Sequence, residues 1–332
     1  MNKDVNNGQS RREFLGRSVA ALAAASFLPS AFSCTGKSVA APAPVDTAAE
    51  AGKVNSKFGG VQIGTITYSW RSMPGGLENI IKYCQEANIS SIELMGDDLE
   101  AYLGAPENPM MKFFRRQAPQ PAAKPGEKPA APRRMGPPKF TPEQQAEIDK
   151  YKEEVKAWRL GLDLSKVEGA RKLLSDAGIS VHIVKMQPSG MGSDEEVDYA
   201  FKVAKAMVAK AVTDEISCDP ILAVSPSIML NFDAGHFFGS TGIHPNEMIK
   251  KYHDRIYSIH LKDKTGPTTG DQPNTNQVWG QGEMPLEDVL LLIKQEKWPI
   301  YCDIELEYDI KPWSDSVKEV GTCVKYARQI LM

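Results

Sequence analysis

The chain has 332 residues, of which 42% are hydrophobic and 24% are charged, and its formal net charge at pH 7 is −3. This is the composition of an ordinary globular protein, with enough apolar residues for a sizeable core. The slight negative charge argues against nucleic acid as a partner, because nucleic-acid-binding surfaces are rich in Lys and Arg.

The first 34 residues resemble an export signal and not a folded segment. Paired Arg11 and Arg12 precede an Ala-rich apolar run at 19–34, which is too short to be a membrane-spanning helix. This pattern is typical of a twin-arginine signal. Cys34 follows Ala-Phe-Ser and resembles a lipoprotein processing site, so it is a candidate for lipidation; the alternative is a plain cleaved signal in which Cys34 is incidental.

Residues 35–57 are rich in Ala and Pro and are predicted to form a flexible tether. Together with the signal, they predict a protein of the periplasm or cell envelope that contacts the membrane only through a lipid anchor. Four other cysteines lack CxxC spacing, and we expect them to be buried small hydrophobic residues: Cys84, Cys218, Cys302 and Cys323.

From residue 58 onward, short apolar strands alternate with amphipathic helices. Strands are predicted at 61–70, 90–96, 179–187, 211–217, 227–233, 255–262 and 299–307. Helices are predicted at 75–89, 166–178, 193–210, 245–254 and 286–297, with a last helix that ends at Leu331. Such alternation predicts a parallel sheet, in which functional sites gather at the C-terminal ends of the strands.

Residues 97–160 interrupt this pattern and are predicted to be an insertion. Their middle, 115–140, is rich in Pro, Ala and Arg and has no apolar periodicity, and proline at this density prevents both helix and sheet. A charged helix is predicted to begin after Thr141, because Thr141 and Gln144 have the spacing of a capping box.

Acidic, basic and histidine residues cluster where the predicted strands end. They are Glu93, His182, Lys185, Glu215, Asp233, His236, His260, Lys262, Glu305 and Glu307. One buried acid at a strand end is usually a salt-bridge partner or a loop cap, but several converging carboxylates repel one another unless a cation lies between them. Carboxylates combined with an imidazole suit Mn²⁺, Mg²⁺, Co²⁺ or Zn²⁺.

Four segments in this order resemble the sugar phosphate isomerase/epimerase group, whose fold is the xylose isomerase-like TIM barrel, a (β/α)8 barrel. They are "LNFDAGH" (230–236), "SIHLKD" (258–263), "WGQGEMPLEDVL" (279–290) and "DIELEY" (303–308). The resemblance covers about 58–332. It implies a metal-dependent enzyme whose substrate is a small sugar, without choosing the sugar.

The resemblance assigns roles to individual positions. It implies that Asp233, His260 and Glu305 are metal ligands, that His236 binds substrate and takes part in catalysis, and that Lys262 polarises or deprotonates substrate. Glu305 is also a catalytic candidate, because a carboxylate beside the metal can move a proton.

Other positions are candidates from their placement alone. Glu215 could be a further metal ligand, with a salt bridge as the alternative. Glu307, which alternates onto the same face as Glu305, could face the substrate. Glu93 and Lys185 are candidate rim contacts, and Trp70 and Trp279 are candidate stacking surfaces for a sugar, with core packing as the alternative.

One strand–helix unit, the fifth, is predicted to be missing. Without the insertion, residues 58–332 fall short of the ~250 residues typical of the barrel, and only seven strands are predicted. The shortage falls between Glu215 and Asp233, where the resemblance implies a helix, a strand and a second helix. The two flanking strands must therefore pair across a short link or leave an open gap, which weakens metal binding and puts catalysis in doubt.

These features predict a metal-dependent isomerase or epimerase acting through an enediolate on an unphosphorylated sugar or keto-sugar. The first alternative is a lyase or hydratase acting on keto-glycosides with the same metal site. The second is a carbohydrate-binding remnant without catalytic activity.

Overall fold

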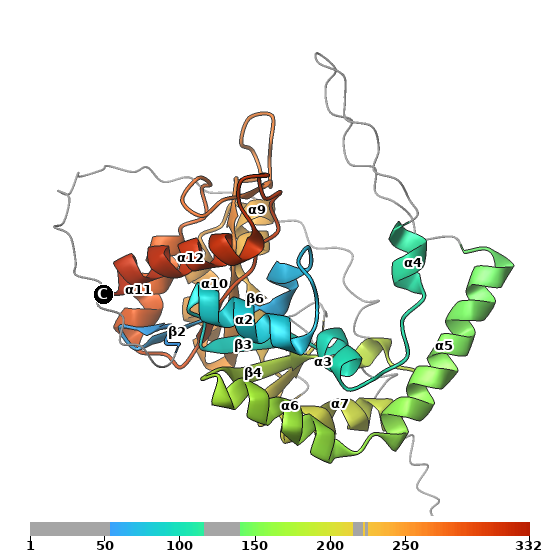
Figure 1. The fold of residues 1–332 in the computed structure, drawn as a ribbon. Helices are drawn as coiled ribbons and strands as arrows, with labels where there is room; N and C mark the ends of the chain where they lie inside the picture. The colour runs from blue at the N-terminus through green and yellow to red at the C-terminus, as the bar shows by residue number, and fades with distance from the viewer. Residues whose placement is uncertain (1–53, 116–139, 215–221, 223–224) are drawn as a thin grey trace, which may run out of the picture.

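The computed structural model describes residues 54–115, 140–214, 222 and 225–332 (Figure 1). The predicted export signal, Cys34, Glu215 and Cys218 lie outside these residues. The predicted tether ends too late, because Ser56 is fully buried and Lys57–Phe58 forms the short strand β1. Ser56 donates to the carbonyl of Ile63, which ties the start of the described domain to the first long strand.

Seven parallel strands form the sheet, in the order β5-β4-β3-β2-β10-β7-β6. Their bounds are β2 Val61–Ile66, β3 Ser91–Met95, β4 Ser180–Lys185, β5 Ala211–Thr213, β6 Leu230–Asp233, β7 Ile256–Leu261 and β10 Tyr301–Ile304. The last strand, β10, pairs with β2 and so brings the two ends of the domain together. A small antiparallel pair, β8 Asp263–Lys264 and β9 Asn276–Gln277, follows β7.

All seven predicted strands are present, but several end earlier than predicted. The chain leaves β2 at Ile66 and forms the short 3-10 helix η1 Thr67–Trp70. Glu305 and Glu307 likewise follow β10 and do not belong to it. The C-terminal ends of the strands therefore continue directly into the segments that carry the candidate site residues.

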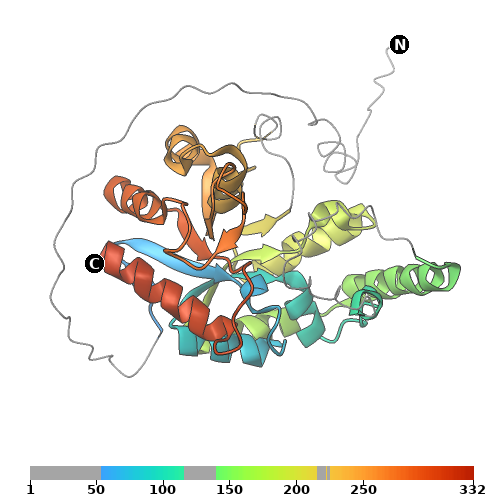
Figure 2. The same cartoon turned by 90° about the horizontal axis from the view of Figure 1, so that it is seen from above.

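Helices surround the sheet (Figure 2). The helices of the predicted pattern are α2 Leu77–Ala87, α6 Leu164–Asp176, α7 Asp194–Ala206, α10 Pro245–Tyr252, α11 Leu286–Glu296 and α12 Ser316–Leu331. The pattern missed α9 Ala234–Thr241, whose N-cap is Asp233. The Asp233 carboxylate accepts a hydrogen bond from the backbone N–H of His236 at 2.7 Å. Asp233 therefore both ends β6 and caps the start of α9.

The predicted insertion at 97–160 is largely helical where the structure describes it. Residues 96–115 contain α3 Gly96–Tyr102 and α4 Met110–Arg115, two helices that were not predicted. The charged helix α5 Pro142–Gly161 has the predicted capping box between Thr141 and Gln144. Figure 1 shows α5 extending away from the sheet.

Arg159 attaches α5 to the rest of the domain. Its guanidinium contacts Glu100 of α3 at 2.8 Å and Glu196 of α7 at 3.0 Å. Both carboxylates are buried, and a guanidinium suits two such partners because its donors point in fixed directions. Arg159 thus ties α5 to both α3 and α7, beside the buried Ile148 and Val155 of the same helix.

The barrel wall is open between β5 and β6. Within the described residues, no backbone ladder joins these two strands, as expected if the fifth unit is missing. Phe201, Val208 and Met229, which precede the two edge strands in sequence, have largely exposed side chains. The described fold is thus an incomplete α/β barrel in which β5 and β6 are not paired, and most of the link between them lies outside the described residues.

Apolar side chains from both the strands and the helices form one continuous core. Cys84, Cys302 and Cys323 are buried within it and are not in disulfides, as predicted for these three. Among the residues that the structure describes, no helix has both the length and the apolar character needed to cross a membrane.

Gly64 of β2 is expected to be intolerant of a side chain. A Cβ there would lie 2.0 Å from Oδ1 of Asp303, a fully buried acid on the neighbouring strand β10. We expect Gly64→Ala to lower the free energy of unfolding by about 1–3 kcal/mol, measured by urea denaturation, because the core must shift to admit the methyl group.

The matched control is Gly169→Ala in the middle of α6, where a Cβ meets nothing within 4 Å. Alanine is the better helix former, so this change should leave stability unchanged or raise it by up to about 1 kcal/mol. Equal destabilisation by the two substitutions would contradict the close approach of Asp303 to Gly64.

Candidate metal centre

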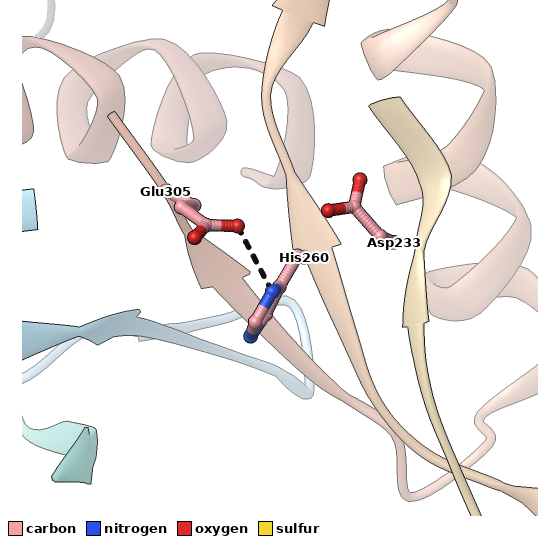
Figure 3. Close-up of side chains that lie close together, drawn as sticks. All are labelled: Asp233, His260 and Glu305. Atoms are coloured by element: carbon pink, nitrogen blue, oxygen red, sulfur yellow. Dashed lines mark ion pairs between the residues drawn. The ribbon is translucent and has the colours of Figure 1, made fainter. Parts of the chain in front are cut away.

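Three neighbouring strands bring Asp233, His260 and Glu305 together. In the parallel ladder, His260 of β7 is in register with Asp233 of β6 on one side and with Asp303 of β10 on the other. Glu305 lies two residues beyond Asp303, so its side chain returns to the same face of the sheet. Figure 3 shows the three side chains converging from these strands.

One ligand atom from each of Asp233, His260 and Glu305 lies within 4.8 Å of the others. Nδ1 of His260 is 2.9 Å from Oε2 of Glu305. His260 and Glu305 are buried, and Asp233 is partly exposed. Two carboxylates and an imidazole at this spacing could supply three donors to a divalent cation of the Mn²⁺ or Zn²⁺ type.

The ammonium group of Lys262 lies among the carboxylates of this cluster. Its Nζ is 2.7 Å from Glu305, 2.8 Å from Asp233 and 3.0 Å from Glu307. The side chain is almost fully buried, so these acids are its main source of charge compensation. Lys262 therefore provides positive charge beside two of the three candidate ligands.

The pKa values of the cluster follow from this pairing. Burial by itself lowers the pKa of His260, but the carboxylates of Glu93 and Glu305 outweigh burial and hold that pKa well above its usual value. Burial raises the pKa of Glu305, but His260 and Lys262 together bring it far below the usual range. The ionised forms of acid and base therefore stabilise each other in the buried interior.

Glu93 does not lie at the rim, as predicted, but beneath His260 in the interior. It is fully buried, and its Oε2 accepts from Nε2 of His260 at 2.7 Å. Oε1 accepts from Thr213 at 2.8 Å, and Oε2 also accepts from Asn231 at 2.9 Å. Its position excludes direct substrate contact, because His260 lies between Glu93 and the carboxylates at the strand ends.

His236 and Glu307 lie together on the solvent side of the cluster. Nε2 of His236 is 3.1 Å from Oε2 of Glu307, and the His236 side chain is 49% exposed. Lys264 donates to Asn276 at 2.9 Å and lies 3.4 Å from Nδ1 of His236. His236 and Glu307 are therefore accessible from solvent, and their predicted contact with a substrate stays a prediction.

The two tryptophans are not available as stacking surfaces. Trp70 is only 3% exposed and packs against Tyr83, and Trp279 is 7% exposed and packs edge-on against Tyr326. The core alternative is therefore correct for both residues in this structure. Lys185 ends β4 in register with Thr213 of β5.

Two residues of the site were not predicted. Thr213 and Asn231 bind the buried carboxylate of Glu93, from the two strands that border the open wall. Asn231 alternates with Asp233 onto the same strand face, and this spacing could have identified it. For Thr213 the sequence carries no comparable signal.

A second buried contact between a histidine and an acid lies one layer deeper. Nε2 of His182 is 2.8 Å from Asp303, and Ser91 lies 2.8 Å from Nδ1 of the same imidazole. Tyr301 stacks on the ring with the centroids 4.1 Å apart. His182 is thus a buried, hydrogen-bonded strand residue, and it lies outside the candidate metal centre.

The residues present fit a divalent cation. Oε2 of Glu305 is buried and faces two cations, yet it has no well-aligned hydrogen bond, so it remains available as a ligand atom. The donor set of two carboxylates and one imidazole is also suitable. Lys262 is the opposing feature, because its ammonium group contacts the same oxygens.

No protein-family model matches the chain, and no curated protein matches it. Solved structures do match. A xylose isomerase domain protein from Alicyclobacillus acidocaldarius has 11% identity and a TM-score of 0.40, and the match covers 81% of this chain and 98% of that chain. A D-tagatose 3-epimerase-like protein has 13% identity and a TM-score of 0.39, covering 82% of this chain and 98% of that one.

A third match is the IOLI protein with a bound zinc atom, at 12% identity and a TM-score of 0.36, covering 82% of this chain and 98% of that chain. With TM-scores below 0.5, the matches assign neither an activity nor a ligand to this chain.

Lys262 is expected to compete with a divalent cation for Asp233 and Glu305. We expect Lys262→Met to destabilise the metal-free protein by roughly 3 kcal/mol, because three carboxylates lose their shared counter-charge. Added Mn²⁺ should then raise the melting temperature of the variant by more than that of the unaltered protein, measured by thermal denaturation with EDTA and with Mn²⁺.

Lys264→Met is the matched control, because Lys264 is also buried but its described hydrogen bonds are to Asn276 and His236. It should not increase the response to Mn²⁺. An identical Mn²⁺ response in all three proteins would show that Lys262 and the cation do not share these oxygens.

Asp98, in α3 at the same end of the sheet, should make stability depend on pH. Burial, with the neighbouring charge of Asp97, raises its pKa to about 6. The folded protein therefore binds this proton more tightly than the unfolded chain. The contribution of Asp98 to the free energy of unfolding falls as the pH rises from about 4 to about 6, and it is constant above that range. We expect Asp98→Asn to gain stability relative to the unaltered protein across this window, measured by urea denaturation; an equal difference at every pH would refute this.

Proposed function

We propose that the chain is a divalent-metal-dependent sugar isomerase or epimerase that acts on an unphosphorylated sugar or keto-sugar in the cell envelope. The observation that supports it is the convergence of Asp233, His260 and Glu305 at the C-terminal ends of three adjacent parallel strands. The envelope location is supported by the twin-arginine pattern of Arg11 and Arg12.

Asp233, His260 and Glu305 would hold the cation. When bound there, a divalent cation would polarise the oxygens of a hydroxy-ketone, acidify the neighbouring C–H and stabilise the charge of an enediolate. Glu305 and Asp233 supply negative charge, and the buried position of Glu305 and His260 keeps water from this side of the site.

The protein's own side chains would then move and place the proton. Glu307 lies between Lys262 and His236, at 3.0 Å and 3.1 Å, on the solvent side of the cluster. A carboxylate in this position can accept a proton from the substrate, and its hydrogen bond with His236 and the charge of Lys262 keep it ionised by lowering its pKa to about 2. His236 is sufficiently exposed to bind a hydroxyl group or to pass the proton onward.

The ammonium group of Lys262 would orient the substrate oxygen. It already lies beside three carboxylates, and their charge raises its pKa above the usual range although burial opposes this. The group is therefore a permanent cation and a hydrogen-bond donor, not a base. Polarisation of the substrate is consequently the more suitable of the two roles predicted for Lys262.

The test is exchange of substrate C–H for deuterium in D₂O, followed by NMR with a panel of ketoses and keto-glycosides. We expect exchange with Mn²⁺ or Zn²⁺ and none with EDTA. His260→Asn should slow exchange by roughly 10²-fold or more, because it removes a ligand. His253→Asn is the control, because His253 stacks on Trp298, away from the cluster.

The product distinguishes the alternatives. An isomer of unchanged mass supports the isomerase or epimerase, and loss of a leaving group supports the lyase or hydratase. Tight carbohydrate binding without exchange in any metal-loaded sample would instead identify a non-catalytic remnant and refute the proposal.

A further inference from the structure

The carboxylate of Glu93 is a fully buried acceptor with partners on three other strands. His260 of β7 lies 2.7 Å from Oε2, Asn231 of β6 lies 2.9 Å from the same oxygen, and Thr213 of β5 lies 2.8 Å from Oε1. An acid that has no access to solvent must be compensated by such donors. Burial raises its pKa, but His260, Asn231 and Thr213 together bring it below the usual value.

The hydrogen bond from His260 to Glu93 determines which of its two ring nitrogens is left to face a metal ion. Nε2 is directed at Glu93, and Nδ1 is directed at Glu305, 2.9 Å away. Figure 3 shows that the dashed contact to Glu305 starts from one ring nitrogen, while the other points away from both Glu305 and Asp233. Only Nδ1 therefore faces the position between the two acids.

We infer that Glu93 is a positioning residue, which holds the Nε2–H of His260 and thereby presents Nδ1 as the ligand atom of the metal centre. This inference rests on the metal binding that the proposed function requires. A carboxylate that accepts from the remote nitrogen of a ligating histidine fixes the ring orientation and raises the basicity of the ligating nitrogen.

The same carboxylate links the two edges of the open wall. Thr213 belongs to β5 and Asn231 to β6, the two strands that no backbone ladder joins within the described residues. Each donates to one oxygen of Glu93, so a single side chain connects both edges to the imidazole.

Mutation can distinguish two roles of Glu93, a structural role in the core and a positioning role toward His260. Thr213→Val removes one donor to Glu93 at nearly constant volume but leaves the contact with His260. Glu93→Gln keeps the shape of the side chain but removes the charge that His260 Nε2–H binds. A purely structural role predicts the same effect of both on metal binding, and a positioning role predicts an effect mainly from Glu93→Gln.

The test is the dissociation constant of Mn²⁺, measured by calorimetry on the unaltered protein, Glu93→Gln and Thr213→Val. We expect Glu93→Gln to weaken binding about 10–100-fold and Thr213→Val to change it less than about threefold. Unchanged affinity in Glu93→Gln, or an equal loss in both variants, would overturn the inference.

A second measurement needs no variant of Glu93. In the Zn²⁺-loaded protein labelled with ¹⁵N-histidine, His260 should carry its proton on Nε2 and bind zinc through Nδ1; the chain has only five histidines, and His260→Asn assigns the signal. Zinc on Nε2 would overturn the inference and leave the proposed function standing. If the unaltered protein binds neither ion, both fail.

Discussion

The candidate site depends on the compensation of charge in a buried space. Glu93, Asp233, Glu305 and Glu307 converge in and above the barrel interior, and like charges at this density would repel one another strongly. His260 and Lys262 prevent this, because each contacts at least two of the acids at 2.7–3.0 Å. The removal of either cation would leave a buried carboxylate, Glu93 or Glu305, with one counter-charge fewer.

The absence of a described ladder between β5 and β6 leaves side-chain hydrogen bonds to hold the buried acid Glu93 at this side of the barrel. A complete barrel would position its interior by strand pairing on all sides, whereas here the two edges meet the interior through Thr213 and Asn231. Side-chain hydrogen bonds to one carboxylate replace the missing ladder in part. The position of the metal centre therefore depends on Glu93 as well as on the ligands.

The same charge compensation opposes metal binding, which the proposed activity requires. Lys262 stabilises Asp233 and Glu305 in the absence of metal, and it contacts the oxygens that a cation would use. Metal binding must therefore outcompete an internal ammonium group, which agrees in direction with the weakened binding predicted from the shortened chain. Weak binding stays a prediction until an affinity is measured.

Local patterns in the sequence were sufficient for much of this protein. The alternation of apolar runs gave all seven strands of the sheet, the Thr141–Gln144 spacing gave the start of α5, and the strand-end motifs gave Asp233, His260 and Glu305. Each of these depends on residues that are close together in the chain, where the periods of helix and strand fix the geometry.

The tertiary structure alone decided which residues meet across strands. It placed Glu93 beneath His260 and not at the rim, buried Trp70 and Trp279 in the core, and set Lys262 between the acids. These outcomes depend on the register of neighbouring strands and on the depth of each side chain in the barrel, and neither leaves a periodic signal in the sequence.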